Sequence, residues 1–310
     1  RLGAPGAGGA DGGAVGAVGS PAGARGLPFD AALAPGGYAW WYLDALSDPQ
    51  PDGTQHALTA IVFVGSVFSP YYAWARHGHG GARARPENHC AVNVALYRRA
   101  EGRPRFSRLW AMTERGAGDL QRDRLRLQIG PSQLAWTEQG LLLTVNERCA
   151  PWAERLQGSV LLQPQRLPAR QFALDAAGHH QWQPIGPVSR VHVAFDHPAL
   201  HWEGTGYLDG NHGSRPLADY LRAWDRSRSI GPDGLTRLHY DLIENNGRTQ
   251  ALALQLSAEG TWQALPAGLM QALPRTAWGL ARRSRIDPAC QQLASLEDGP
   301  FYARTLLTPA

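Results

Sequence analysis

The clearest structural signal in this sequence is the stretch Arg124-Leu125-Arg126-Leu127-Gln128-Ile129, in which polar and apolar residues alternate. Successive side chains of a β-strand point to opposite faces, so the three apolar residues share one face. Similar short runs begin at Tyr38 and are separated by clusters of Gly, Pro, Asp and Asn. This pattern is typical of an all-β sandwich or barrel.

The same reasoning predicts strands along most of the chain. Asn245-Asn246-Gly247 predicts a hairpin turn, because Asn and Gly tolerate positive φ, and only Ala264–Leu273 has a period compatible with an amphipathic helix. The predicted strands are Tyr38–Leu46, Ala57–Val67, Cys90–Tyr97, Arg108–Glu114, Arg124–Ile129, Gln133–Trp136, Leu141–Arg148, Leu156–Leu162, Arg190–Phe195, His201–Leu208, Leu221–Arg228, Leu235–Glu244, Gln250–Ser257, Ala277–Ser284 and Phe301–Leu307.

Two features divide the chain. Residues 1–27 are almost entirely Gly and Ala with no aromatic residue, and such a segment buries too little apolar surface to offset its ordering entropy, so we predict a disordered tail. The stretch from Gln163 to Pro187 is punctuated by prolines and interrupts the strand pattern. We therefore predict two β domains of comparable size, 28–186 including a linker and 187–310.

Composition excludes several classes of function. All 30 basic residues of the 310 are Arg, so a Schiff-base lysine and a Walker-type phosphate lysine are both ruled out. A net charge of +4 is small for this length, so nucleic acid is not an expected partner. The three cysteines form no CxxC pair, and no metal site is predicted. The longest apolar stretch, Ala57–Phe68, is shorter than the roughly 20 residues of a spanning helix, so we expect any membrane contact to be peripheral.

The segment from Gly178 to Gly213 concentrates His, Trp, Tyr and Asp residues. His180-x-Trp182 and Tyr207-x-Asp209 each have the spacing that puts both side chains on one face of a strand. A carboxylic acid beside aromatic rings can protonate an alkene, and the rings can stabilise the resulting carbocation by cation–π attraction. The alternative is a strand with ordinary aromatic packing and a turn Asp before Gly210.

Long strings of the sequence resemble the acyclic carotenoid 1,2-hydratases, also called hydroxyneurosporene synthases, of purple phototrophic bacteria. The resemblance covers nearly all of residues 38–304. The strings are Tyr38-Ala-Trp40-Trp41-Tyr42-x-Asp44, Gly65-Ser-Val-Phe68-Ser-Pro70-Tyr71-Tyr72-Ala-Trp74-Ala, Pro86-Glu-Asn-His89-Cys-Ala-Val-Asn-Val-Ala-Leu-Tyr97, Trp110-Ala-Met-Thr-Glu114-Arg115, Gly178-His-His180-Gln-Trp182-x-Pro184-Ile-x-Pro187 and Gly206-Tyr207-Leu208-Asp209.

The resemblance implies two lipocalin-like β-barrel domains packed together, and addition of water to the terminal C1–C2 double bond of an acyclic carotenoid such as neurosporene or lycopene. On this hypothesis Asp209 donates the proton, and Tyr207 fixes or polarises the Asp209 carboxyl group. Trp182 faces the cation, and His180 orients the acid or the attacking water and accepts its proton. Hydration changes no net oxidation level, so no cofactor and no metal are expected.

A long polyene needs an apolar groove, and a membrane-borne substrate favours peripheral association with the inner or photosynthetic membrane, aided by arginines near Arg83–Arg85 or Arg282–Arg285. Two other functions stay open at this point: a lipocalin-like carrier that binds the polyene without turnover, and a pericyclase or isomerase that incorporates no solvent oxygen. The oligomeric state is not predicted. The residues expected to line the groove are Trp40, Trp41, Phe68, Tyr71, Tyr72 and Trp74.

Overall fold

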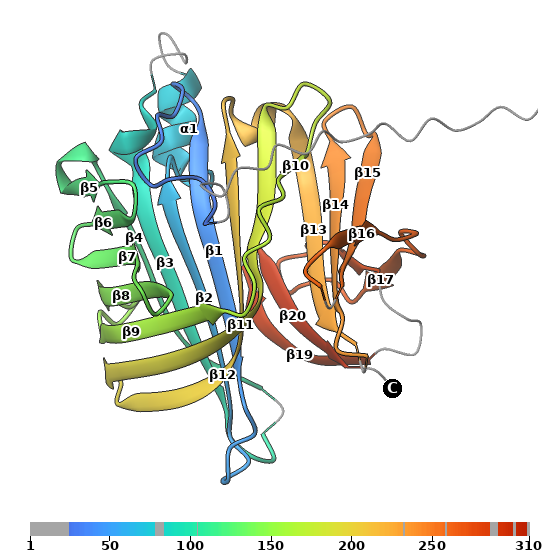
Figure 1. Cartoon of the computed structure of the whole chain (residues 1–310). Coiled ribbons are helices and arrows are strands. Elements are labelled where there is room, and N and C mark those ends of the chain that lie inside the picture. The colour runs from blue at the N-terminus through green and yellow to red at the C-terminus, as the bar shows by residue number, and fades with distance from the viewer. Residues whose placement is uncertain are drawn as a thin grey trace, which may run out of the picture.

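The structure of the chain is a computed structural model, shown in Figure 1, and it is built almost entirely of β-strands. One short α-helix, α1 (Pro70–His77), and three 3-10 turns, η3 (Pro86–His89), η4 (Ala117–Asp119) and η5 (Leu217–Asp219), are its described helical elements. The described residues are 25–77, 84–103, 105–231, 233–257, 259–285, 291–299 and 302–308.

The largest sheet curls into a nearly closed barrel, and its described strand pairs are antiparallel. The short strand β10 (Phe172–Ala173) pairs with β11 outside the main order. From edge to edge the order is β4 (Ser107–Arg115), β3 (Cys90–Arg99), β2 (Gln55–Val64), β1 (Tyr38–Ser47), β12 (Leu200–Gly213), β11 (His180–His197), β9 (Arg155–Pro164), β8 (Leu141–Arg148), β7 (Ser132–Trp136), β6 (Arg126–Ile129) and β5 (Leu120–Arg122).

The C-terminal strands form a second, smaller set of sheets. A four-stranded sheet has the order β13 (Leu221–Ile230), β14 (Thr236–Glu244), β15 (Thr249–Leu256) and β16 (Trp262–Ala264). Two hairpins complete it, β17 (Gln271–Leu273) with β18 (Arg282–Ser284), and β19 (Gln291–Asp298) with β20 (Ala303–Thr308). In Figure 1 the strands β1, β11 and β12 run between the barrel and β13–β15.

Strand β1 is buried on both faces, which explains why its first six residues, Tyr38–Leu43, are apolar without alternation. Its odd-numbered residues from Ala39 to Ala45 pack into the barrel core. Tyr38, Trp40 and Tyr42 point the other way, into a second core shared with β13–β16. The wall formed by β1, β11 and β12 therefore separates two apolar cores.

The all-β prediction is confirmed, and most predicted strands lie within a few residues of observed ones. The turn at Asn245–Gly247 joins β14 to β15 as predicted, with Gly247 at a φ of 87°. The helix-compatible period of Ala264–Leu273 does not form a helix: β16 ends at Ala264, β17 begins at Gln271, and Pro266 and Gly268, which has a positive φ, break any helix between them. In the predicted strand Ala277–Ser284 only the last three residues pair.

The predicted boundary between residues 186 and 187 falls inside β11, which pairs with both β12 and β9. Pro184 and Pro187 lie where the β11–β12 register shifts, since proline lacks the N–H that a regular ladder needs. The prolines therefore bend one strand instead of joining two domains, and the chain leaves the large sheet only after β12. The predicted tail lies outside the described residues except for 25–27, of which Leu27 packs against the barrel core.

Candidate functional site

Asp209 lies four residues before the end of β12, on the face that looks away from the barrel core and toward β13 and β14. Neighbouring strands place Tyr42 of β1 on one side of it and Pro184 of β11 on the other. The residue is only 1% exposed. The Asp209 carboxyl group is therefore closed off from solvent in this structure.

The two oxygens of the Asp209 carboxyl group have different surroundings. Oδ2 accepts hydrogen bonds from Trp182 Nε1 at 3.0 Å, from the Tyr207 hydroxyl at 3.0 Å and from Arg226 Nη1 at 2.7 Å. Within the described residues, the one hydrogen bond to Oδ1 is a long contact of 3.5 Å from Asn211 Nδ2. Three donors thus converge on one oxygen and leave the other able to carry a proton.

Opposing influences act on the Asp209 carboxyl group. Its burial raises its pKa above the ordinary value, because a charged carboxylate loses solvation in the apolar core. The Arg226 charge and the hydrogen bonds from Trp182 and Tyr207 act in the lowering direction, and burial prevails. A raised pKa favours the neutral form that proton donation requires.

Arg226 is part of a larger buried network with Asp44. The Arg226 guanidinium lies over the rings of Tyr42 and Tyr207, at 4.1 and 4.7 Å from their centroids, and its Nη2 is 3.6 Å from Asp44 Oδ2. Asp44 also accepts a bond from Arg228 Nε at 3.0 Å. Burial alone would raise the pKa of Asp44, but the neighbouring arginines hold it well below its usual range.

Aromatic rings surround the acid. Trp182 is fully buried and packs between Phe172 and Tyr240, with ring centroids 5.6 and 4.9 Å away. Nearby, the ring of Trp224 on β13 stacks on Trp40 and on Phe68, at 6.4 Å from each. The face of β1, β11 and β12 that carries the acid is therefore rich in π systems that favour a cation.

Three of the four predicted catalytic side chains come together, and the fourth does not join them. Asp209, Tyr207 and Trp182 are in direct contact. His180 lies two residues from Trp182 along β11, about 7 Å farther, where its Nδ1 pairs with the Tyr38 hydroxyl at 3.0 Å. Its imidazole pKa is lowered by burial.

The six predicted groove residues are dispersed. Trp40 and Phe68 belong to the aromatic group around Trp224, whereas Trp41 points into the barrel core and packs on Phe29 because adjacent residues of a strand face opposite ways. Tyr72 is buried and donates to the Gly37 carbonyl at 2.6 Å. Tyr71 and Trp74 are exposed on α1, at 71% and 77%. The structure therefore does not bring these six side chains together in one groove.

The arginines predicted to touch a membrane have different surroundings in the two ranges. Arg283 pairs with Asp225 at 2.8 Å and Arg285 with Asp241 at 2.7 Å, so both charges are used inside the protein. Arg85 is exposed, and Arg83 lies outside the described residues. Within the described part of the chain, no helix is long and apolar enough to cross a membrane.

The sequence reasoning missed Arg226 and Asp44. A signal for them was present: Trp224, Arg226 and Arg228 alternate along β13 and so share one face, which is unusual for a strand that also carries buried apolar residues. Asp44 likewise interrupts an otherwise apolar strand. Buried charges of this kind need partners of opposite charge, and Arg226 and Asp44 lie beside each other.

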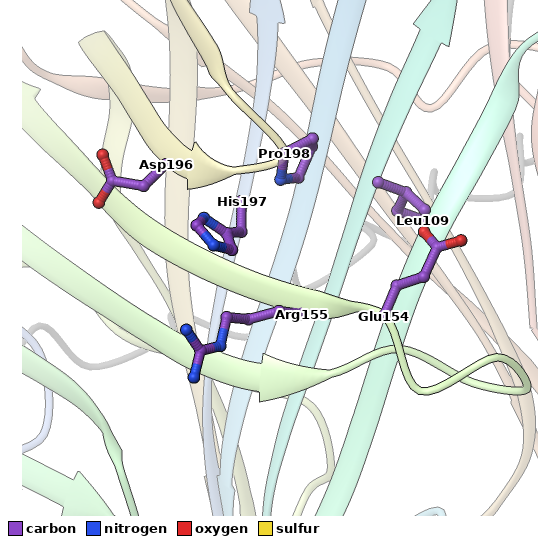
Figure 2. Close-up of a pocket in the computed structure, with 6 residues that line it drawn as sticks. All are labelled: Leu109, Glu154, Arg155, Asp196, His197 and Pro198. Carbon is purple, nitrogen blue, oxygen red and sulfur yellow. The ribbon is translucent and has the colours of Figure 1, made fainter.

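A surface hollow of about 340 Å³ lies elsewhere, at the turns that join β8 to β9 and β11 to β12. Asp196 and His197, which line it, belong to the polar segment from Gly178 to Gly213 but lie at the opposite end of β11 from His180. As Figure 2 shows, the hollow contains none of the predicted site residues; it is lined by Leu109, Glu154, Arg155, Asp196, His197 and Pro198.

Comparison with known proteins identifies the family. The family model of the carotenoid hydratase CrtC matches residues 60–309. The chain belongs to this family. It is 46% identical to the acyclic carotenoid 1,2-hydratase of Thiocapsa roseopersicina, over 92% of this chain and 67% of that protein. It is 44% identical to the enzyme of the same name from Rubrivivax gelatinosus, over 90% of this chain and 66% of that protein.

The resemblance of the sequence to the carotenoid hydratase family is thus confirmed, and the chain spans about two thirds of the length of these two relatives. Among solved structures, a putative AttH protein from Nitrosomonas europaea superimposes with a TM-score of 0.51. The two share 13% identity over 77% of this chain and 72% of that protein, so the likeness concerns the fold alone.

Proposed function

We propose that this member of the carotenoid hydratase family adds water to the terminal C1–C2 double bond of an acyclic carotenoid such as neurosporene or lycopene, giving a tertiary 1-hydroxy end group. The observation that carries the proposal is the buried Asp209, whose Oδ2 is held by Trp182, Tyr207 and Arg226. Burial raises the pKa of this acid, and aromatic rings face it, which are the two features that alkene protonation needs.

The first step is proton transfer from neutral Asp209 to C2. The π electrons of the double bond form the new C2–H bond, C1 becomes a tertiary carbocation, and Asp209 becomes a carboxylate. The indole of Trp182 and the ring of Tyr207 face the developing cation, and a desolvated cation–π contact contributes about 2 kcal/mol. Because Oδ2 is already surrounded by donors, Oδ1 is the atom that gives up the proton.

The second step is capture of the cation by water. The water oxygen bonds to C1, and the proton it releases returns to the Asp209 carboxylate, so the acid is restored and the net reaction is addition of one water. The sequence hypothesis gave this proton to His180. Because the His180 imidazole bonds Tyr38 and lies beyond Trp182 from the acid, we assign it instead the role of orienting Tyr38 at the edge of the aromatic group.

Incubation with lycopene in detergent and oxygen-18 water tests the proposal directly. We expect a 1-hydroxy product that carries one labelled oxygen, because the hydroxyl comes from solvent. Recovery of bound but unchanged lycopene would identify a carrier, and a product without the label would identify an isomerase or pericyclase. Either result overturns the hydratase proposal.

We also propose that the protein reaches its membrane-borne substrate through α1, which lies at the upper edge of the molecule in Figure 1. Tyr71 and Trp74 are exposed there, and amphipathic aromatic side chains favour the lipid headgroup region. Because Arg283 and Arg285 are paired with Asp225 and Asp241, α1 is the better candidate for the membrane contact.

Replacing both Tyr71 and Trp74 by serine is therefore expected to weaken binding to phosphatidylglycerol-containing vesicles by about tenfold or more, since each buried aromatic contributes about 1.5–3 kcal/mol. Vesicle co-sedimentation measures this. Trp152→Ser, which removes an exposed indole from the turn after β8, is the matched control and is expected to bind like the wild type. Equal binding by the α1 variant would refute this contact.

A further inference from the structure

Arg226 joins two buried carboxyl groups that lie on different strands. Its Nη1 is 2.7 Å from Asp209 Oδ2 and its Nη2 is 3.6 Å from Asp44 Oδ2. We propose that Arg226 is a positioning residue for proton transfer: it stabilises the carboxylate that Asp209 becomes, and Asp44 holds it in place. This inference rests on the proposed function and deepens it.

Protonating an alkene demands a strong acid, so the conjugate base must be well stabilised. Hydrogen bonds between charged partners are roughly twice as strong as neutral ones, and Arg226 supplies such a bond to Oδ2. The Trp182 and Tyr207 donors are directed at the same oxygen before the reaction begins. Donors that are already oriented need no rearrangement as charge develops on Asp209.

Asp44 holds Arg226 in place and leaves its Nη1 bonded to Asp209. Arg228 and Arg304 also lie against Asp44, with Arg304 Nη2 at 3.7 Å, so its negative charge is shared among three guanidinium groups. The group formed by Asp44, Asp209 and these arginines keeps an excess of positive charge even when Asp209 is ionised. The excess positive charge attracts the newly formed carboxylate, while burial raises the pKa of the resting acid.

The other groups that face Asp209 do not titrate in its place. Burial raises the pKa values of the surrounding tyrosines, Arg226 stays charged, and the pKa of Asp44 is held low. Among these groups, Asp209 is the one that we expect to titrate in a moderate pH range. The facing groups are Tyr207 on β12, Trp182 on β11, Tyr42 and Asp44 on β1, Arg226 and Arg228 on β13, and Tyr240 on β14.

The test is the pH dependence of lycopene hydration in Arg226→Gln. Only neutral Asp209 gives its proton, so activity falls as pH rises through its pKa. Removing the neighbouring positive charge raises that pKa, and we expect the fall to move upward by about 1–3 pH units. The rate at low pH should drop by about 10²–10³-fold, because a preorganised donor is lost.

Three further variants distinguish electrostatic positioning from a purely structural role. Arg226→Lys keeps the charge and is expected to keep the wild-type position of the pH transition. Asp44→Asn removes a negative charge near Asp209, which lowers the pKa of the acid, so its transition should move to lower pH. Arg228→Gln is the matched control, since Arg228 bonds Asp44 and not Asp209. Its activity should fall at a pH well below the pH at which the activity of Arg226→Gln falls.

A second readout does not depend on turnover. The infrared carbonyl band of protonated Asp209, assigned by its absence in Asp209→Asn, should titrate at higher pH in Arg226→Gln and at lower pH in Asp44→Asn than in the wild type. If the wild type hydrates lycopene but neither variant moves the band or the activity transition, the inference is overturned and the proposed function stands. If the wild type incorporates no oxygen-18, the proposed function fails, and with it the catalytic role of Arg226, whatever the band shows.

Discussion

Asp209→Asn is expected to reduce lycopene hydration by about 10²–10⁴-fold, the usual contribution of a general acid. The amide has the size of the carboxyl group and its oxygen can still accept from Trp182 and Tyr207, so the local packing is retained. It cannot supply an acidic proton. Turnover measured by chromatography, alongside lycopene binding measured by the shift of the polyene absorption, separates the two properties. Binding should persist while turnover is lost.

Asp225→Asn is the matched control for this experiment. Asp225 is another carboxyl group beside an arginine, 2.8 Å from Arg283, but it is only partly buried and lies outside the group around Asp209. Its loss should leave the hydration rate within about threefold of wild type, since mutations away from the reacting atoms remove no contact to them. An active Asp209→Asn protein would refute the acid assignment.

The strands were predictable because their signals are local. Alternation in Arg126–Ile129 and the turn residues at Asn245–Gly247 reflect side-chain direction and backbone preference within a few residues. The domain boundary was not predictable in this way. Pro184 and Pro187 look like linker residues in isolation, but the pairing of β11 with strands on both sides accommodates them as register shifts.

The acid site was partly predictable for the same reason. Tyr207 and Asp209 share a face by their spacing, and Trp182 joins them because β11 and β12 are neighbours in the sheet. Arg226 and Asp44 come together only because β13 packs across β1. This is a contact between two sheets, and residue spacing along the sequence does not predict it. His180 shares the face of Trp182, but the rise of two residues along the strand separates it from the acid. Its hydrogen-bond partner is Tyr38, which the shared face alone could not predict.

Glu147→Ala is expected to destabilise the barrel more than any surface substitution, because the buried Glu147 on β8 joins the edge strand β4 to β7 and β8. In the described residues β4 and β5 end the large sheet and do not pair with each other. Across this seam the buried Glu147 of β8 accepts from Arg115 on β4 at 2.8 and 3.0 Å, and from Thr113 on the same strand at 2.8 Å. It also accepts from Ser132 on β7 at 2.6 Å.

Removing one partner of a buried ion pair leaves the other charge buried without a partner, which lowers the free energy of unfolding by about 3–5 kcal/mol. We therefore expect the melting temperature of Glu147→Ala to fall by roughly 10 °C, given about 2–4 °C per kcal/mol for a domain of this size. Circular dichroism during heating measures it. Glu203→Ala is the control, since Glu203 pairs with Arg190 on the surface, where such pairs are worth only about 0–1 kcal/mol.

The double variant Arg115→Met with Glu147→Leu distinguishes two causes of the instability: the unpaired charge of Arg115, and the loss of the polar link between β4 and β8. If the cost of Glu147→Ala comes mainly from the unpaired Arg115, replacing both partners by apolar side chains recovers much of the stability, as it does for other buried pairs. If the polar link itself closes the barrel, the double variant melts as low as Glu147→Ala. A Glu147→Ala protein that melts at the wild-type temperature would show that the seam is held by the apolar core alone, through residues such as Ala111 of β4 and Val145 of β8.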